Sequence, residues 1–333
     1  MPRADLVLEG GGVKGLGLVG AVLGLLRAGY TFERVAGTSA GSIVAAFLAA
    51  GADERDVAAV MDKLEYAKVP DRAPPGIPLV SEGISLLWKR GAYEGDYIHE
   101  FVRRELERRG VRTFGDLRRD DPGDDENLEP YQRYKLVVTA TDITSGRLLR
   151  LPWDYHLLHR NPDEQLVADA VRASISIPLY FEPVTVRDGE TGEPTTLVDG
   201  GVLSNFPIEI FDRTDYAEPR WPTLGVRVVP DLPGGDKDVF PAIALPALPP
   251  VRLLERVVAT AIVGHDQTYL GRPCVRRRTF EVDTRAVGVV DFGVSREKRA
   301  AVVAEGVEAA RRFLAGWSWE DYKRDCIAAP ARG

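Results

Sequence analysis

Residues 37–41 read Gly-Thr-Ser-Ala-Gly, and this pentad constrains the fold more than any other part of the chain. A short apolar run precedes it and a long one follows it. In that setting the G-x-S-x-G pattern is typical of a tight strand-to-helix turn, which lifts a serine hydroxyl clear of the backbone. Side chains at Gly37 or Gly41 would collide with the crossing strand and helix. We therefore predict a strand–turn–helix unit with Ser39 at its apex.

A second glycine cluster lies about 25 residues upstream, and it also joins a strand to a helix. Asp5–Glu9 is predicted as a buried strand, Gly10–Gly12 as a loop and Gly15–Ala28 as a helix. A strand at Arg34–Thr38 and a helix at Ser39–Ala50 follow. Two such units in succession favour the α/β class, with a parallel sheet covered by helices.

The rest of the chain continues this alternation. Further helices and strands are predicted at Asp53–Leu64, Glu94–Arg109, Tyr134–Thr141, Arg147–Leu151, Asp163–Ser174, Thr196–Val198, Leu224–Val229, Val251–Tyr269, Val275–Val282 and Arg296–Leu314. Two proline-rich segments, 70–78 and 230–250, interrupt the alternation, but neither separates two self-sufficient patterns. We therefore expect one domain over residues 1–333, with these segments as inserted loops, one or the other of which covers the mouth of a site.

Composition excludes several other classes of protein. The net charge of −7 argues against general nucleic-acid binding, which requires a basic face. The two cysteines, Cys274 and Cys326, have no C-x-x-C partner and make no disulfide framework, so a reducing compartment is expected. The sequence also lacks Cys and His at metal-ligand spacing. The longest apolar stretch, Leu16–Leu26, is too short to span a bilayer. We expect a soluble, cytoplasmic protein for which peripheral membrane contact stays open.

A serine hydroxyl is a poor nucleophile at neutral pH and needs an adjacent base. A Ser-His-Asp triad in the α/β-hydrolase order places its histidine after the acid. His265 is the only histidine after Asp199, and it lies in a helical pattern without loop signals. Asp199 itself ends an apolar strand in the turn Asp199-Gly200-Gly201, where a carboxylate can accept the serine proton directly. We favour Asp199 as the base and keep His265 as the alternative.

Acyl transfer also needs fixed donors for a developing negative charge, and the loop Glu9–Gly15 offers them. A glycine-rich loop at a helix N-terminus presents free N–H groups and the positive end of a helix dipole. One such donor is typically worth about 3–4 kcal/mol of the barrier. Because Gly10–Gly12 carry no side chains, their backbone can approach a substrate oxygen closely.

Together, the three motifs resemble the patatin-like phospholipases. The G-G-G-x-[RK]-G loop, the G-T-S-A-G turn and the D-G-G turn occur in that family's order, and the likeness runs from about Leu6 to Pro207. The segments 140–142 and 172–178 are also similar to the family. The resemblance implies a three-layer α/β/α fold with a mainly parallel sheet, a glycerolipid acyl ester as substrate, and no metal or cofactor. Residues 208–333 are expected to complete the domain.

The same resemblance implies a Ser-Asp dyad without histidine. Ser39 is the implied acylated nucleophile, and Asp199 is the implied general base, which later activates the deacylating water. The implied oxyanion donors are the N–H groups of Gly10, Gly11, Gly12 and Val13, of which Gly11 and Gly12 come first. The residues implied to support the site are Lys14, Gly37, Gly41, Gly200 and Gly201. Many relatives have Asp or Gly where this chain has Glu9, a departure that touches the strand end and not the donors.

Two other functions fit parts of the pattern. Gly10, Gly12 and Gly15 satisfy the dinucleotide fingerprint G-x-G-x-x-G, which also needs an acid at the end of the second strand. Glu33 precedes that strand, and the serine turn occupies the expected position. The other alternative is a catalytically silent scaffold on the same fold, since fold does not determine activity. The sequence carries no signal for the lipid head group or the oligomeric state.

Overall fold

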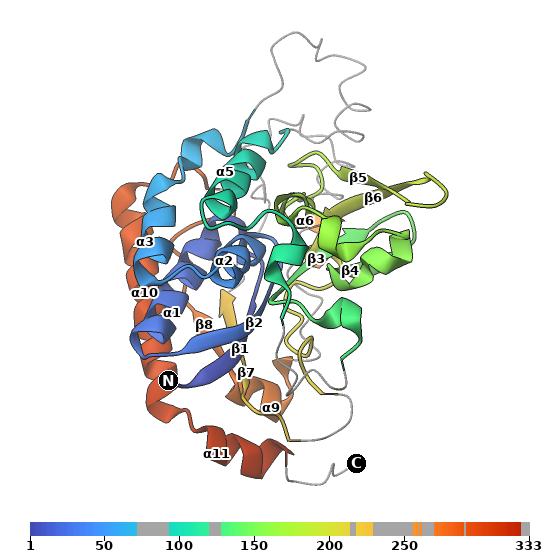
Figure 1. Cartoon of the computed structure of the whole chain (residues 1–333). Coiled ribbons are helices and arrows are strands. Elements are labelled where there is room, and N and C mark those ends of the chain that lie inside the picture. The colour runs from blue at the N-terminus through green and yellow to red at the C-terminus, as the bar shows by residue number, and fades with distance from the viewer. Residues whose placement is uncertain are drawn as a thin grey trace.

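An eight-stranded sheet forms the centre of the computed structural model (Figure 1). Its strands are β1 Arg3–Leu8, β2 Thr31–Gly37, β3 Leu136–Asp142, β4 Arg147–Leu151, β5 Val184–Arg187, β6 Pro194–Asp199, β7 Thr223–Val228 and β8 Thr279–Val282. They lie in the order β5-β6-β3-β2-β1-β7-β8, with β4 paired to β3. The structure describes residues 1–71, 93–119, 128–213, 218–228, 256–258, 260–261, 270–289 and 291–327.

The middle of the sheet is parallel, as the sequence predicts. The neighbours β3, β2, β1, β7 and β8 all run in the same direction. In β3 and β7 every residue is buried, and in β1 only the first is exposed. Strands that are apolar on both faces belong to sheets covered on both sides. β4 and β6 pair antiparallel with β3, and β5 pairs antiparallel with β6. The predicted α/β class with a mainly parallel sheet is confirmed.

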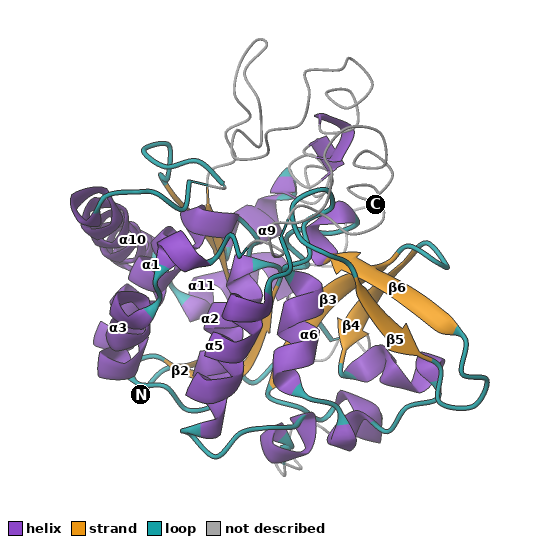
Figure 2. Ribbon diagram, turned by 90° about the horizontal axis from the view of Figure 1, so that it is seen from above, coloured by secondary structure: helices purple, strands orange, loops and turns teal. Residues whose placement is uncertain are grey.

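Helices pack around this sheet (Figure 2). They are α1 Gly15–Arg27, α2 Ala40–Ala49, α3 Glu54–Lys63, α5 Asp96–Glu107, α6 Val167–Ser174, α9 Pro273–Arg277, α10 Arg296–Gly316 and α11 Trp319–Tyr322. The chain moves along the sheet in one direction from β1 through α1 to β2, and on through α2 to β3. Because such crossovers are right-handed, α1 and α2 lie on the same face.

Most predicted elements agree with the structure to within a few residues, and the differences have local causes. The predicted helix Asp163–Ser174 is divided, because Gln165 and Leu166 are extended and pair with the segment before Phe114. The predicted strand Val275–Val282 is wrong in its first half. Pro273 starts the short helix α9 there, and only Thr279–Val282 forms a strand.

Glycines let the last long helix pack closely against the first. A Cβ atom at Gly20 of α1 would lie 2.0 Å from the carbonyl oxygen of Val303 in α10. A Cβ atom at Gly306 of α10 would lie 2.3 Å from the carbonyl oxygen of Gly17. The backbones of the two helices are therefore in contact (Figure 1). This packing holds the C-terminal part of the chain against the first β–loop–α unit.

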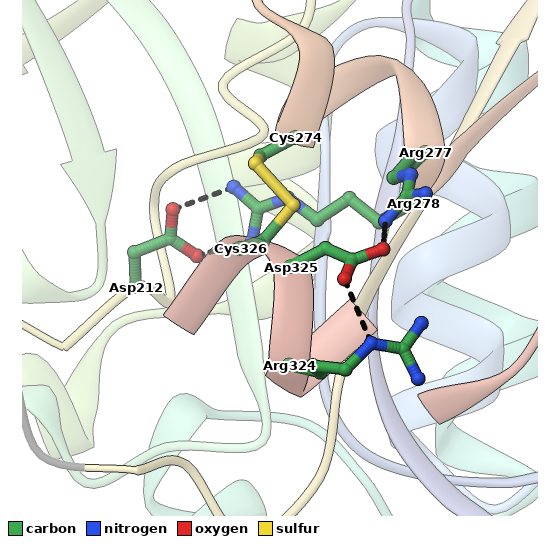
Figure 3. Close-up of a disulfide and its surroundings, with 7 residues drawn as sticks. All are labelled: Asp212, Cys274, Arg277, Arg278, Arg324, Asp325 and Cys326. Atoms are coloured by element: carbon green, nitrogen blue, oxygen red, sulfur yellow. Dashed lines mark hydrogen bonds and ion pairs between the residues drawn. A yellow bond between two sulfur atoms is a disulfide. The ribbon is translucent and has the colours of Figure 1, made fainter. Parts of the chain in front are cut away.

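The two cysteines form a single disulfide, which their spacing did not predict (Figure 3). Cys274 in α9 is bonded to Cys326, 52 positions later, with 5.7 Å between the Cα atoms. Arg277 forms an ion pair with Asp325 beside the bond. The pairing depends on the C-terminal segment folding back against α9, which no local spacing reveals. Since disulfides persist in oxidising surroundings, it also argues against the reducing compartment expected from the cysteine count.

Removing this disulfide should destabilise the protein. For a closed loop of this length, loss of the bond is expected to lower the free energy of unfolding by about 2–4 kcal/mol. Urea unfolding of Cys274→Ala/Cys326→Ala against the oxidised wild type measures the difference. Under reducing conditions the two proteins should unfold alike. Equal midpoints without reductant would show that the bond does not form in solution.

Some predictions concern residues outside the described ranges. These are most of segment 70–78, segment 230–250, most of the helix predicted at Val251–Tyr269, and His265. Among the described helices, none combines the length and the apolarity needed to cross a membrane.

Candidate active site

Strand β3 brings the predicted site residues together. Gly37, the last residue of β2, lies opposite Val138 of β3. Asp199, the last residue of β6, lies opposite Ala140, two residues further along the same edge of β3, because β4 occupies the other edge. Because β6 is antiparallel to β3, it delivers Asp199 to the level at which β2 ends and the turn with Ser39 begins. The sheet topology therefore joins two segments that are 160 positions apart in the sequence.

Ser39 occupies a strained turn of the predicted kind. Its φ is 50° and its ψ is −126°, and residues other than glycine rarely adopt a positive φ of this kind. A Cβ atom at Gly37 would lie 2.3 Å from the carbonyl oxygen of Gly41, so the turn is too tight for a side chain there. The Ser39 N–H donates to Ser174 Oγ at 2.9 Å, and Ser42 Oγ donates to the Ser39 carbonyl oxygen at 2.6 Å. These bonds hold the backbone and leave the Ser39 hydroxyl for other partners.

Asp199 is buried, with 1% of its surface exposed. Its Oδ1 accepts the Gly201 N–H at 2.8 Å. Burial raises the pKa of Asp199 to about 7, and the nearby Ser39 hydroxyl and the Gly201 N–H oppose this rise. Oδ2 accepts no hydrogen bond from the described residues, so the contact between the carboxyl group and the Ser39 hydroxyl is looser than a formed hydrogen bond. Loose contacts of this kind are common before substrate binds.

The glycine loop also lies beside Ser39. Of the four N–H groups implied as oxyanion donors, two already donate to backbone carbonyl oxygens. The Gly10 N–H donates to the carbonyl oxygen of Asn205 at 3.1 Å, and the Val13 N–H donates to that of Val289 at 2.8 Å. The N–H groups of Gly11 and Gly12 have no acceptor among the described residues. The structure therefore leaves the central pair for a ligand.

Two buried charged side chains, Glu9 and Lys14, lie at the two ends of the glycine loop. Glu9 is 4% exposed, and its carboxylate accepts the Val228 N–H at 2.7 Å and Arg227 Nε at 3.3 Å. It fastens the end of β1 to the end of β7, so this departure from the family pattern has a structural role. Lys14 is buried, and its charge helps to lower the pKa of Asp283 to about 2, after the larger effect of Arg285.

Asn205 is a site residue that the sequence analysis missed. It follows Asp199 by six positions, and its Nδ2 donates to the Gly10 carbonyl oxygen at 3.1 Å. The sequence feature that could have identified it is a polar residue just before Phe206-Pro207 and close after the D-G-G turn.

An apolar cavity of about 80 Å³ opens beside Ser39. The side chains that line it include Leu16, Val19, Ile43, Val44, Ile175 and Phe292. Leu16 and Val19 come from the start of the apolar run 16–26, and Ile43 and Val44 come from the start of the run 43–48. Leu18 and Leu25 belong to the core instead.

The other candidate chemistries have less support among the described residues. His99 and His159 each contact an aspartate at 2.8 Å, and His156 contacts a backbone carbonyl. None of these histidines lines the cavity at Ser39. Glu33 lies near the start of β2 and pairs with Arg3 and Arg119, away from the strand end that a dinucleotide ribose requires. No group of three potential ligands that could hold a metal occurs in the described ranges.

Comparisons with known proteins identify a family and several relatives of this chain. The model of the patatin-like phospholipase family matches residues 6–212. The uncharacterized protein YqhO of Bacillus subtilis is 34% identical over 317 residues, which cover 95% of this chain and 99% of that protein. The uncharacterized NTE family protein Mb2594 of Mycobacterium bovis is 31% identical over 62% of this chain, which spans 27% of that protein.

A solved structure gives the same fold. VipD from Legionella pneumophila matches with a TM-score of 0.53 and 20% identity, over 95% of this chain and 67% of that chain. Identity at this level shows a shared architecture.

Proposed function

The chain belongs to the patatin-like phospholipase family, and from this membership and the site geometry we propose that it is a serine acyl hydrolase of glycerolipids. The observation that carries the proposal is the placement of Asp199, a buried carboxyl group with a pKa of about 7, beside the Ser39 hydroxyl. A base with a pKa near the working pH combines an ionised fraction with useful proton affinity. Membership of the family by itself supports a lipid hydrolase.

The proposed reaction has two half-reactions. Asp199 Oδ2 takes the proton of the Ser39 hydroxyl as Oγ attacks the ester carbonyl carbon, and the N–H groups of Gly11 and Gly12 stabilise the oxyanion. The carbonyl re-forms, and the alcohol leaves with the proton held by Asp199. Asp199 then takes a proton from water, whose oxygen attacks the acyl-enzyme. The fatty acid is released, and the proton returns to Ser39 Oγ.

The proposed substrate is an acyl ester with a long apolar chain. The cavity beside Ser39 is lined by aliphatic and aromatic side chains, which favour an acyl chain over a polar group. Substrates of this kind reside in membranes, so we propose peripheral contact with a lipid surface.

Incubation with mixed phospholipid vesicles, followed by lipid mass spectrometry, tests this function. We expect free fatty acid to appear with an equal amount of lysophospholipid, or with a fully deacylated head group. The Ser39→Ala variant is the matched control. Intact lipids after incubation with folded protein that contains Ser39 would oppose the proposal and favour the silent scaffold. A rise in melting temperature with NAD or ATP in that protein would instead favour nucleotide binding.

A further inference from the structure

We propose that Asn205 is a positioning residue that fixes the glycine loop at its working distance from Ser39. This inference rests on the proposed acyl hydrolysis and deepens it, because it assigns a role to a residue that touches neither substrate nor the reacting atoms.

The first observation is a reciprocal pair of hydrogen bonds between Asn205 and Gly10. The Gly10 N–H donates to the Asn205 carbonyl oxygen at 3.1 Å, and Asn205 Nδ2 donates to the Gly10 carbonyl oxygen at 3.1 Å. Asn205 therefore holds both the N–H group and the carbonyl oxygen of Gly10. Asn205 is 8% exposed, so water competes little for these bonds.

The second observation is where the Asn205 side chain lies. A Cβ atom at Gly10 would be 2.2 Å from Asn205 Oδ1 and 3.1 Å from Ser39 Cβ. The amide of Asn205 thus occupies the space that a side chain at Gly10 would take, beside the nucleophile. Gly10 immediately precedes Gly11 and Gly12, so a shift of Gly10 carries both proposed donors with it.

The third observation is the turn that connects Asn205 to Asp199. The N–H groups of Leu203 and Ser204 donate to the Gly200 carbonyl oxygen at 3.1 and 2.9 Å. This short turn reverses the chain after β6 and returns Asn205 towards the glycine loop. The proposed base and the clamp on the proposed oxyanion loop therefore belong to one short hydrogen-bonded segment, residues 199–205.

Positioning of this kind affects the transition state more than the bound substrate. Oxyanion donors act on charge that develops during the reaction, and loss of one donor typically costs about 10²–10³-fold in rate. Since displacement by about 1 Å can cost about 10²-fold, a loosened loop should lower kcat and leave KM nearly constant. An aspartate at 205 would keep the shape but lose the Nδ2 donor and place a negative charge beside the developing oxyanion.

Kinetics of Asn205→Ala and Asn205→Asp test the proposal, with Asn161→Ala as the control. Asn161 is exposed and bonds to Glu164 in a distant turn, so its variant should behave like the wild type. We expect kcat to fall about 100-fold in Asn205→Ala and further in Asn205→Asp, with KM within about twofold. In Asn205→Ala the midpoint of the pH profile should stay near 7, because Asp199 keeps its surroundings. Asn205→Asp preserves side-chain volume and supplies the test where Asn205→Ala does not fold.

Wild-type kcat in a folded Asn205 variant, while Ser39→Ala is inactive, would overturn the positioning role and leave the proposed function intact. A shifted pH midpoint in Asn205→Ala would overturn it too, because Asn205 would then act on the base. The Gly10→Ala variant completes a double-mutant cycle with Asn205→Ala. If both residues act through one contact, kcat of the double variant should fall no further than kcat of the worse single variant. Additive losses would contradict a shared contact.

Discussion

Replacement of Ser39 with alanine should lower the rate of ester hydrolysis by at least about a thousandfold. The structure places this hydroxyl beside both the Asp199 carboxyl group and the glycine loop, whose Gly11 and Gly12 N–H groups have no acceptor among the described residues. Residual activity should be low but measurable, because the remaining donors still stabilise attack by water. The measurement is kcat with a short water-soluble ester, which avoids effects of lipid binding.

A control separates chemistry from folding in this variant. The neighbouring Ser42 donates its hydroxyl to the Ser39 carbonyl oxygen and has no proposed part in the chemistry. Ser42→Ala should lose some stability but retain activity within about tenfold, since the net contribution of one hydrogen bond is about 1 kcal/mol. A folded Ser39→Ala protein with wild-type kcat would assign the reaction to another residue.

Replacement of Asp199 with asparagine should lower kcat by about 10²–10⁴-fold, the usual contribution of a general base. In the wild type, activity should fall below pH 7, because Asp199 must be ionised to accept the serine proton and its pKa is about 7. We expect kcat/KM to drop about tenfold for each pH unit below that midpoint. The residual activity of Asp199→Asn should lack this step. Near wild-type activity would move the base elsewhere, with His265 as the first residue to test.

The same carboxyl group makes a prediction about stability. The pKa of Asp199 is higher in the folded protein than the ordinary value of 3.8, so the folded state holds the proton more tightly. Its contribution to stability is present below about pH 4 and is lost as the pH rises to about 7. Asparagine has no proton to lose, so Asp199→Asn should be at least as stable as the wild type at pH 8. Thermal melts at pH 5 and pH 8 measure this difference.

Local patterns predicted the part of the fold that carries the nucleophile. The first strand, glycine loop, helix, second strand and serine turn follow from apolar runs and glycine positions, and their boundaries agree with the structure to within a few residues. The helix predicted at Asp53–Leu64 begins with Asp53 as its cap, and the Asp53 carboxylate accepts the Asp56 N–H at 2.9 Å. These features depend on neighbours in the sequence, which a pattern can capture.

Contacts between distant segments were harder to predict. The residues alone did not show that Asp199 meets Ser39, because their meeting depends on β6 entering the sheet antiparallel to β3. The bond between Cys274 and Cys326 and the clamp of Asn205 on Gly10 were missed for the same reason. In α9, a proline at the first helical position outweighed the β-branched residues that follow it.

The central claim, that the Ser39 hydroxyl is the nucleophile, is tested most directly by covalent labelling. The protein is treated with a fluorophosphonate, digested and analysed by tandem mass spectrometry. We expect one phosphonate adduct, on Ser39, formed in step with the loss of esterase activity and slowed strongly in Asp199→Asn. An adduct on another residue, or unmodified Ser39 in protein that has lost its esterase activity, would contradict the account.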